Sequence, residues 1–421
     1  MDVPSYRRNT STRMNTSINL DNTEKAFAYK SDKALRKARF LFRFMKSAAL
    51  VKLATKITPW LIKSGFPIKK LIQKTLFEQF VGGQTLEATG IVASTLLKFN
   101  VQVILDFGLE GGEKDDQHYD AAAEQFKKVI TYASSQQNIP FISIKITGLT
   151  SVALLEKLNS PLLYLEKIQD QISFETRINE LPNEELNKWN KLLARVDSIC
   201  QLAAEKNIGL MIDAEESWIQ EPIDFIAESL MKKYNKEKVI VYNTIQLYRQ
   251  DRLNFLKNSF THARENNYIL GIKLVRGAYM EKENKRAQKL GYPTPIHFTK
   301  EATDLDFNDA VKFCLSQLEF ISTIIASHNE SSNLLATDQL ISLSIPLNDP
   351  HVHFSQLYGM SDNLTFNLSD AGLNVSKYLP FGPIEEVIPY LMRRAEENSS
   401  ISGQTTRELN LINKECTRRQ L

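Results

Sequence analysis

The sequence predicts an α/β protein built as a (βα)8 barrel, and three observations support this fold class. Short apolar runs typical of buried strands alternate with amphipathic stretches of helical period. Eight such runs occur, and eight repeats favour a closed parallel barrel over an open doubly wound sheet. No Gly-x-Gly-x-x-Gly pattern follows any run, which counts against a Rossmann dinucleotide site.

The composition is that of an ordinary globular protein with one large domain and some additions. The chain has 421 residues, of which 43% are hydrophobic and 24% charged, and its formal net charge is +3. This charge is too small to imply nucleic-acid binding, so we expect no nucleic-acid partner. No uninterrupted apolar run reaches the roughly 18 residues of a transmembrane helix.

Cysteine and histidine usage argues against disulfides and metal ions. Cys200, Cys314 and Cys416 are far apart in the sequence and form no CxxC pair. The six histidines show no HExxH or similar ligand spacing. We therefore expect no metal site, and we expect a reducing compartment such as the cytoplasm.

Residues 1–30 are polar and weakly patterned, and we interpret them as a disordered N-terminal tail. Arginines among serines and threonines are typical of a transit segment, which is the alternative interpretation. The acidic residues Asp2 and Asp21 argue against that alternative.

Residues 31–90 are predicted to form a basic helical arm. From Lys33 to Phe77 there is no acidic residue, and apolar residues recur at helical spacing. Pro59 and Gly65 divide the stretch into successive helices. Such an arm packs on the main domain with its lysines in water, or it lies on an anionic membrane surface. We favour packing for the fold and keep peripheral membrane contact as a second role.

The barrel is expected over residues 91–400, followed by a C-terminal tail over 401–421. Each candidate strand is followed by a helix or a helix-sized segment, as parallel strands require. In chain order the candidate strands are residues 101–107, 141–147, 208–213, 239–245, 268–275, 321–327, 352–357 and 373–378.

Polar residues stand at the carboxyl ends of most candidate strands, where (βα)8 barrels build their active sites. Taken singly, each has an ordinary explanation: Asp213 caps a helix, Lys145 extends to solvent, and His328 is a buried, hydrogen-bonded histidine. Taken together they indicate one polar pocket. The residues at these ends include Lys145, Asp213, Thr244, Gln246, Lys273, Arg276, Ser327, His328, Asn329 and Tyr378.

The pocket has more cations than anions, which suggests an anionic substrate, an anionic cofactor or both. Buried charges need partners, so we expect Asp213 to pair with a lysine or an arginine. Gly277 follows Arg276 and permits close approach of the backbone to a ligand.

The stretch after the last strand predicts a turn at Gly382-Pro383 and then a helix. Tyr390, Arg393, Arg394 and Glu397 have the spacing of one helical face. Two adjacent guanidiniums beside an aromatic ring form a clamp for a carboxylate or phosphate. The alternative is a solvated surface helix with salt bridges.

These motifs, taken in order, resemble the proline dehydrogenase family of FAD-dependent flavoenzymes, as a single-function member. The resemblance covers roughly residues 100–400, and the arm before residue 80 matches only loosely. The matching pieces are Ser143-Ile-Lys145, Met211-Ile-Asp213-Ala-Glu-Glu216, Thr244-Ile-Gln246, Lys273-Leu-Val-Arg-Gly-Ala-Tyr279, Ser327-His-Asn329, Gln356-Leu-Tyr-Gly-Met360 and Tyr378 through Asn398.

The resemblance implies a distorted barrel with its last helix over the mouth, and FAD at the strand ends. It implies oxidation of L-proline to 1-pyrroline-5-carboxylate, with hydride transfer from C5 to flavin N5 and electrons passed to a quinone. By resemblance Asp213 and Lys273 are catalytic, while Lys145, Tyr378, Tyr390, Arg393 and Arg394 bind proline. The implied FAD contacts are Ala214, Thr244, Gln246, Arg276, Gly277, Ala278, Ser327, His328, Asn329, Leu357 and Glu397.

The order Lys273 then Arg276 reverses the Arg/Lys order of many members, which leaves the tuning of the flavin potential open. The bulky Tyr378 favours proline over hydroxyproline. The alternatives are a hydroxyproline dehydrogenase and a non-redox barrel that binds an anionic metabolite. Because a quinone lies in a membrane, we expect the protein to contact the inner membrane face peripherally. If the source is eukaryotic, we expect this membrane to be mitochondrial.

Overall fold

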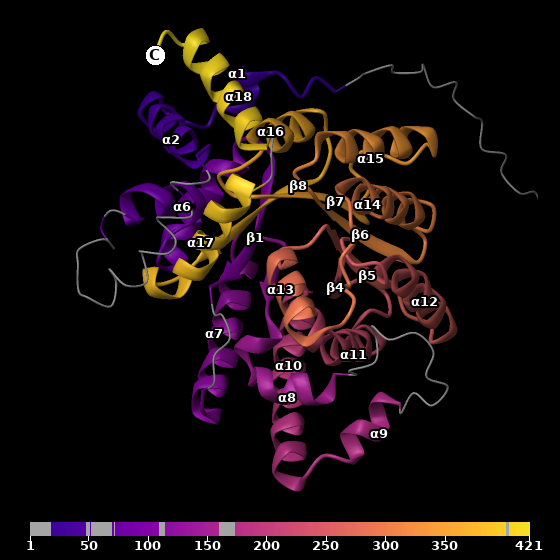
Figure 1. Cartoon of the computed structure of the whole chain (residues 1–421). Helices are drawn as coiled ribbons and strands as arrows, with labels where there is room; N and C mark the ends of the chain where they lie inside the picture. The colour runs from indigo at the N-terminus through magenta and orange to yellow at the C-terminus, as the bar shows by residue number, and fades with distance from the viewer. Residues whose placement is uncertain are drawn as a thin grey trace, which may run out of the picture.

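Eight parallel strands form a closed barrel in sequence order, with β8 paired to β1 (Figure 1). The computed structural model describes residues 18–47, 51, 70, 72–108, 114–159, 173–400 and 404–421, without the side chains of 396–400 and 404. The predicted (βα)8 fold is confirmed. The strands are β1 (Val101–Phe107), β2 (Phe141–Ile144), β3 (Gly209–Ile212), β4 (Val241–Gln246), β5 (Leu270–Val275), β6 (Ile321–Ala326), β7 (Val352–Leu357) and β8 (Val375–Phe381).

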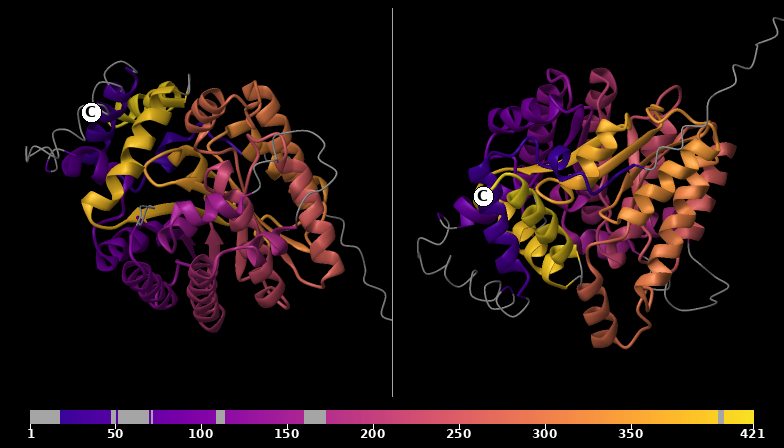
Figure 2. Two further views of the ribbon diagram at one scale, coloured as in Figure 1. Left: turned by 60° about the horizontal axis from the view of Figure 1, so that its bottom comes forward. Right: turned by 90° about the horizontal axis from the view of Figure 1, so that it is seen from above.

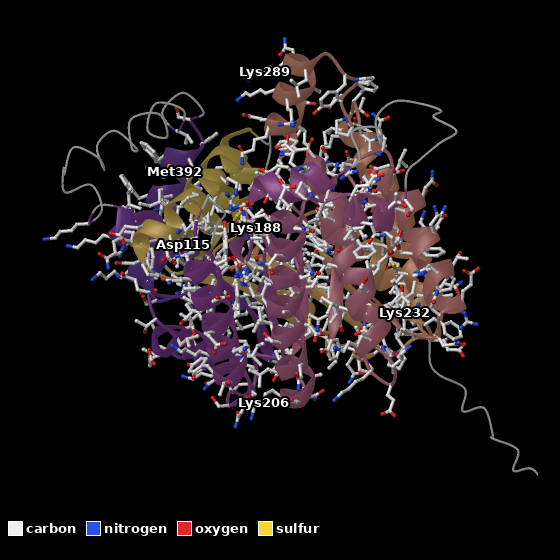
Figure 3. All side chains as sticks on the ribbon, turned by 90° about the horizontal axis from the view of Figure 1, so that it is seen from below. Asp115, Lys188, Lys206, Lys232, Lys289 and Met392 are labelled. Atoms are coloured by element: carbon white, nitrogen blue, oxygen red, sulfur yellow. The ribbon has the colours of Figure 1, made fainter. Side chains whose placement is uncertain are left out.

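Helices cover the outside of the barrel, which explains why the strands are continuous apolar runs: parallel strands are buried on both faces. Polar side chains of the outer helices, such as Lys188, Lys206 and Lys232, point to solvent (Figure 3). The elements between strands are α7 (Asp116–Ser134), η2 (Ile146–Gly148), α8 (Val152–Leu158), α9 (Phe174–Asn179), α10 (Asn183–Lys206), α11 (Ser217–Tyr234), α12 (Arg252–Glu265), α13 (Met280–Leu290), α14 (Lys300–Leu315), α15 (Glu330–Ser342) and α16 (Asp362–Asp370).

Strand β8 is longer than the sequence suggested. Its pairing with β1 continues to Phe107 opposite Phe381, so Tyr378 lies three residues before the strand end. The prediction that strand eight ends at Tyr378 is therefore wrong. The long partner strand supplies the extra pairing, and it accommodates Pro380 opposite Asp106.

The described part of the arm before β1 packs on the rest of the protein, in line with the interpretation that we favoured, and its helix α6 takes the place of a barrel helix. Its helix α6 lies against β1 and β8, where the eighth helix of a regular barrel would pack, while α17 packs against η1, α2 and α18. Residues 48–50, 52–69 and 71 of the arm lie outside the described part. The arm and the C-terminal elements are α1 (Thr23–Ala26), α2 (Asp32–Met45), η1 (Gln73–Phe77), α5 (Glu78–Phe80), α6 (Leu86–Leu97), α17 (Ile384–Ser400) and α18 (Gln404–Arg418).

The two ends of the described chain pack side by side (Figure 2). Phe27 is 1% exposed, and its carbonyl accepts a hydrogen bond from Arg419 at 2.8 Å. The prediction of a disordered tail therefore does not hold for residues 18–30, and the expected C-terminal tail contains the helix α18. Residues 1–17 lie outside the described part. Local sequence could not reveal this packing, because the partners are about 390 positions apart.

No helix among the described residues combines the length and apolarity needed to cross a bilayer.

The loop after β7 touches the arm closely at Gly359. Its φ is +80°, and a Cβ there would lie 2.0 Å from the carbonyl oxygen of Gln79. Gly372 also has a positive φ, of +89°, but nothing lies within 4 Å of its Cβ position.

We predict that Gly359→Ala destabilises the protein more than Gly372→Ala. Both changes carry the left-handed backbone cost of about 1–2 kcal/mol. Only Gly359→Ala adds a collision with backbone, worth about 1–3 kcal/mol more. Urea unfolding of both variants measures the difference, and equal losses would contradict the close packing of the arm on this loop.

Candidate active site

The barrel interior changes from apolar to polar toward the carboxyl ends of its strands. Ile104 and Met211 belong to a small apolar cluster inside the barrel, beside Tyr378. Successive side chains of a strand alternate between the two faces, so the next inward positions after these two residues are Asp106 and Asp213. The strand register therefore places two carboxylates directly above the apolar layer.

Asp213 is the centre of a group of polar side chains at this level. One of its carboxylate oxygens accepts a hydrogen bond from the Lys273 ammonium. The other accepts from the Tyr378 hydroxyl at 2.7 Å and lies 3.8 Å from the Lys145 ammonium. The Lys145 ammonium also lies 3.9 Å from an oxygen of Asp106. The predicted pairing of Asp213 with a lysine is confirmed.

Charge explains the protonation states in this group. Burial raises the pKa of Asp213, but the ammoniums of Lys273 and Lys145 outweigh it and hold the pKa at about 2. Burial and the carboxylates of Asp106 and Asp213 hold the pKa of Tyr378 well above its ordinary value. The group at neutral pH therefore contains an ionised Asp213 and a neutral Tyr378 phenol that donates to it.

Arg276, after β5, is held on three sides. It donates to Asp304 at 2.7 Å, to the Ser327 hydroxyl at 2.7 Å and to the Ser332 hydroxyl at 2.8 Å. Its guanidinium carbon lies 4.3 Å from the Phe307 ring centre. Arg276 and Ser327, both expected in the pocket, are thus brought together as a rigid cationic unit.

Gly277 and Ala278 are exposed immediately after this arginine. Gly277 has a φ of +143°, and a Cβ would meet the Tyr248 ring at 2.3 Å. The glycine is therefore required by packing within the protein itself, a reason that the sequence did not reveal.

Thr244 and Gln246, on β4, bond to the neighbouring strand end. The Thr244 hydroxyl donates to the Ile212 carbonyl at 2.8 Å, and the Gln246 amide donates to the Glu215 carbonyl at 2.7 Å. Ala214 lies between these two acceptors in the sequence and is 9% exposed. Burial raises the pKa of the Glu215 carboxyl to about 7, although it accepts from the Thr147 amide.

His328, after β6, uses both of its ring nitrogens within the protein. Nδ1 lies 2.8 Å from the Ser361 hydroxyl, and Nε2 lies 3.4 Å from the backbone nitrogen of Leu357. Burial and nearby cations lower the pKa of His328 to about 3. The next residue, Asn329, caps α15 through its side-chain oxygen. The hydrogen bonds agree with the ordinary explanation given for His328 taken singly, while its contact with FAD stays a prediction.

The helix α17 carries the predicted clamp. Tyr390 and Arg394 lie together, with the guanidinium carbon 5.3 Å from the ring centre. Tyr390 packs in the apolar cluster shared with α2 and η1, whereas Tyr378 packs against the cluster inside the barrel. Arg393 is half-buried, and the side chain of Glu397 lies outside the described part. The Arg394 charge contributes to the lowered pKa of His328.

Two carboxylates of the site were not predicted as site residues. Asp106 could have been found, because it interrupts an apolar strand as Lys145 does. Glu215 was expected among the anions of the pocket, but sequence does not show that its side chain is buried. Asp304, which fixes Arg276, lies on α14 and carries no local signal at all.

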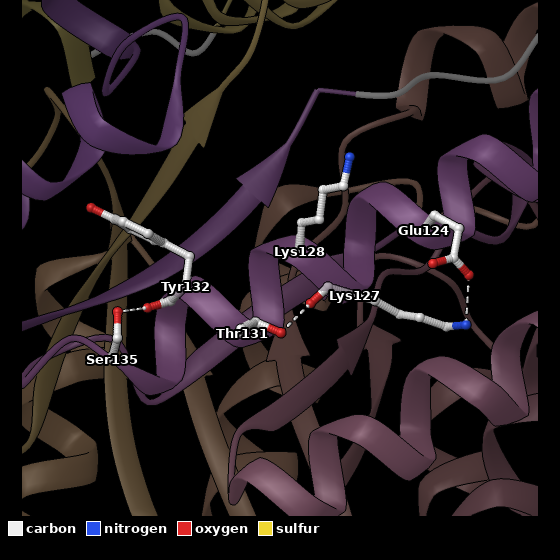
Figure 4. A pocket seen from close by; sticks show the side chains of 6 residues that line it. All are labelled: Glu124, Lys127, Lys128, Thr131, Tyr132 and Ser135. Atoms are coloured by element: carbon white, nitrogen blue, oxygen red, sulfur yellow. Dashed lines mark hydrogen bonds and ion pairs between the residues drawn. The ribbon is translucent and has the colours of Figure 1, made fainter.

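A hollow on the outer face of α7 is separate from this site (Figure 4). A single helix lines it, and its lining includes an ion pair of Lys127 with Glu124 at 2.7 Å. It offers no group from a strand end. Its lining residues are Glu124, Lys127, Lys128, Thr131, Tyr132 and Ser135.

We predict that Asp213→Asn lowers stability by about 3 kcal/mol near neutral pH, because two buried lysines lose their counter-charge. The pKa of Asp213 is depressed, so its stabilising effect is complete above about pH 4 and is lost as pH falls through about 2. The difference in unfolding free energy between Asp213→Asn and wild type, measured by urea unfolding, should therefore become smaller as the pH is lowered. Asp309→Asn, which removes an exposed partner of Lys312, should cost under about 0.5 kcal/mol. A constant gap for Asp213→Asn would refute the ionised pairing.

Comparisons with known proteins show the family of this chain. Residues 93–407 match the family model described as proline dehydrogenase. The mitochondrial proline dehydrogenase 1 of Dictyostelium discoideum is 34% identical over 379 residues, which is 84% of this chain and 66% of that protein. The mitochondrial proline dehydrogenase 1 of Arabidopsis thaliana is 33% identical over 376 residues, which is 83% of this chain and 75% of that protein.

A solved structure shares the fold. Proline utilization A (PutA) from Bdellovibrio bacteriovorus, inactivated by N-propargylglycine, matches with a TM-score of 0.69 and 19% identity. The match covers 92% of this chain and 40% of that protein. The chain thus spans about two thirds of the Dictyostelium relative and less than half of PutA. With the family model matched over most of its length, the chain belongs to the proline dehydrogenase family.

Proposed function

We propose that the protein oxidises L-proline to 1-pyrroline-5-carboxylate with FAD as cofactor and a quinone as the final electron acceptor. The observation that carries the proposal is the group of Asp213, Lys273, Lys145 and Tyr378 at the barrel mouth of a proline dehydrogenase family member. This group offers cations for a carboxylate and a neutral aromatic ring beside them.

The side chains at the strand ends have chemistry that fits FAD. Arg276 is a rigid cation suited to a pyrophosphate, and the exposed backbone of Gly277 and Ala278 follows it directly. When bound, FAD would accept the hydride from proline C5 at its N5 atom. The proposed contacts are Ala214, Thr244, Gln246, Arg276, Gly277, Ala278, Ser327, His328, Asn329, Leu357 and Glu397.

The chain's own residues would bind and orient the substrate. Lys145 would hold the proline carboxylate with Arg393 and Arg394, which would present C5 at a defined angle. Asp213 fixes Lys273 and the Tyr378 hydroxyl, so the phenol ring has one orientation beside the substrate. The Lys273 ammonium would stabilise negative charge that develops on the reduced cofactor.

A membrane role of the arm is part of this proposal, because a quinone resides in a bilayer. The helix α2 exposes Phe40 by 69% and Phe44 by 40%, while Leu35 and Phe42 are buried on its other side. Basic residues share the exposed face with the two phenylalanines, as in helices that lie on anionic membranes. Those exposed basic residues are Lys33, Arg36 and Arg43.

We predict that the purified protein binds FAD and that L-proline bleaches the flavin absorbance more effectively than hydroxyproline.

We predict that Arg394→Ala raises the KM for proline by about 10- to 100-fold through loss of a charge-assisted bond. Arg264→Ala is the control: it removes an arginine of α12 that lies over the Phe320 ring, and the KM of this variant for proline should match that of wild type. Steady-state kinetics with a quinone analogue measure both variants.

Three results would each overturn a part of the proposal. A colourless protein that gains no activity with added FAD would refute the flavoenzyme and favour a non-redox barrel. Faster bleaching by hydroxyproline would favour a hydroxyproline dehydrogenase. An unchanged KM in Arg394→Ala would remove this residue from the carboxylate clamp.

We predict that the double change Phe40→Ser, Phe44→Ser weakens binding to anionic liposomes several-fold, because each exposed ring would enter the interface. Phe298→Ser is the control, since that ring is 87% exposed and lies outside the arm. Liposome sedimentation measures both variants. Unchanged binding of the double variant would remove α2 from any membrane contact.

A further inference from the structure

Ser361 has an unfavourable backbone conformation that contacts with other residues must stabilise. It precedes α16 with a φ of +50°, in the left-handed region that favours glycine. For a residue with a Cβ this conformation is strained, so surrounding contacts must hold it.

Those contacts come from the C-terminal helix α18. The Glu408 carboxylate accepts hydrogen bonds from the backbone amide and from the hydroxyl of Ser361, the latter at 3.2 Å. Glu408 is 5% exposed, so its carboxyl group is largely shielded from solvent at this contact. It also lies just beyond residue 407, where the match to the family model ends.

On its other side, the Ser361 hydroxyl meets His328. The backbone amide of Leu357 can only donate, so His328 Nε2 must be the acceptor of that bond. In a neutral imidazole the proton then sits on Nδ1, which donates to the Ser361 hydroxyl at 2.8 Å. The hydroxyl has one proton of its own, and Glu408 accepts it. The three residues form a chain of hydrogen bonds with one consistent direction.

The charged groups around this chain favour a neutral ring. Lys377, Arg394 and Arg276 all act to lower the pKa of His328. Asp362, beside Ser361, pairs with Lys377 at 2.9 Å and lies 3.6 Å from the Lys30 ammonium. Burial raises the pKa of Glu408 to about 7, but in either protonation state the oxygen facing Ser361 accepts its two hydrogen bonds.

We propose that Glu408 is a positioning residue for His328: through Ser361, and together with the Leu357 amide, it fixes the tautomer and the ring plane of this histidine at the candidate active site. The C-terminal helix thereby contributes to a site formed by the strands. The consequence for catalysis rests on the proposed function, in which His328 contacts FAD. With both ring nitrogens bonded within the protein, that contact would use ring carbons or backbone.

Nitrogen-15 NMR of the histidine rings tests the proposal without cofactor or substrate. The His328 signals are identified by their loss in His328→Gln. Wild type should show a protonated Nδ1 and an unprotonated Nε2. In Glu408→Ala the Ser361 hydroxyl is free to donate to Nδ1 at 2.8 Å, a shorter contact than the 3.4 Å one from the Leu357 amide to Nε2, so we expect a shift toward the Nε2-protonated tautomer. Glu408→Gln keeps an acceptor oxygen and should restore the wild-type pattern.

Two further variants keep the test decisive. Ser361→Ala leaves Glu408 and α18 in place but removes the hydroxyl that accepts from Nδ1–H, so the Nδ1 signal should shift while the Leu357 amide still keeps Nε2 unprotonated. Glu415→Gln changes another buried carboxylate of α18, one that pairs with Arg418 and Arg419, and it should leave the His328 signals unchanged. Unchanged signals in Ser361→Ala, or an equal shift in Glu415→Gln, would overturn the proposal.

Activity separates this proposal from the proposed function. If both hold, Glu408→Ala should lower kcat for proline by about tenfold with a smaller change in KM, because one positioning hydrogen bond is lost. A tautomer shift in a protein that does not oxidise proline would refute the proposed function and leave the role of Glu408 standing. An unchanged tautomer in a Glu408→Ala enzyme that still oxidises proline would refute the role of Glu408 and leave the proposed function standing.

Discussion

The structure of the candidate site depends on one buried carboxylate that holds two ammonium groups. Asp213 contacts Lys273 directly, lies near Lys145 and accepts from the Tyr378 hydroxyl. None of these charges could be buried alone, because an unpaired ion in a barrel interior costs several kcal/mol. The group places cations, a carboxylate and a neutral phenol at one level of the barrel.

A second buried network joins the ends of the chain to the barrel mouth. Lys377 of β8 is fully buried and pairs with Asp362, which also accepts from the Tyr29 hydroxyl of the N-terminal segment. Next to it, Glu408 of the C-terminal helix holds Ser361. The loop between β7 and α16 is thus fixed from both termini. We infer that segments outside the barrel help to shape the site that the barrel forms.

Much of this arrangement was predictable because the relevant signals are local. Each strand is an apolar run, and a polar residue that ends such a run must lie at the barrel mouth once the strands are parallel. Lys145, Asp213 and Lys273 were found in this way. Asp106 carried the same signal and was overlooked. Contacts between distant elements were not predictable, and Asp304 holding Arg276 is the clearest case.

The sequence by itself determined the barrel, the positions of its strands and the set of polar residues at their ends. These follow from periodicity and from chain direction, which need no knowledge of distant contacts. Only the tertiary structure decided that residues 18–30 and α18 pack together, that β8 continues past Tyr378, and that Tyr390 packs with the arm. Each of these depends on a partner element, on β1 for the strand and on helices far along the chain for the rest. A local sequence pattern does not show which distant segment will pack against it.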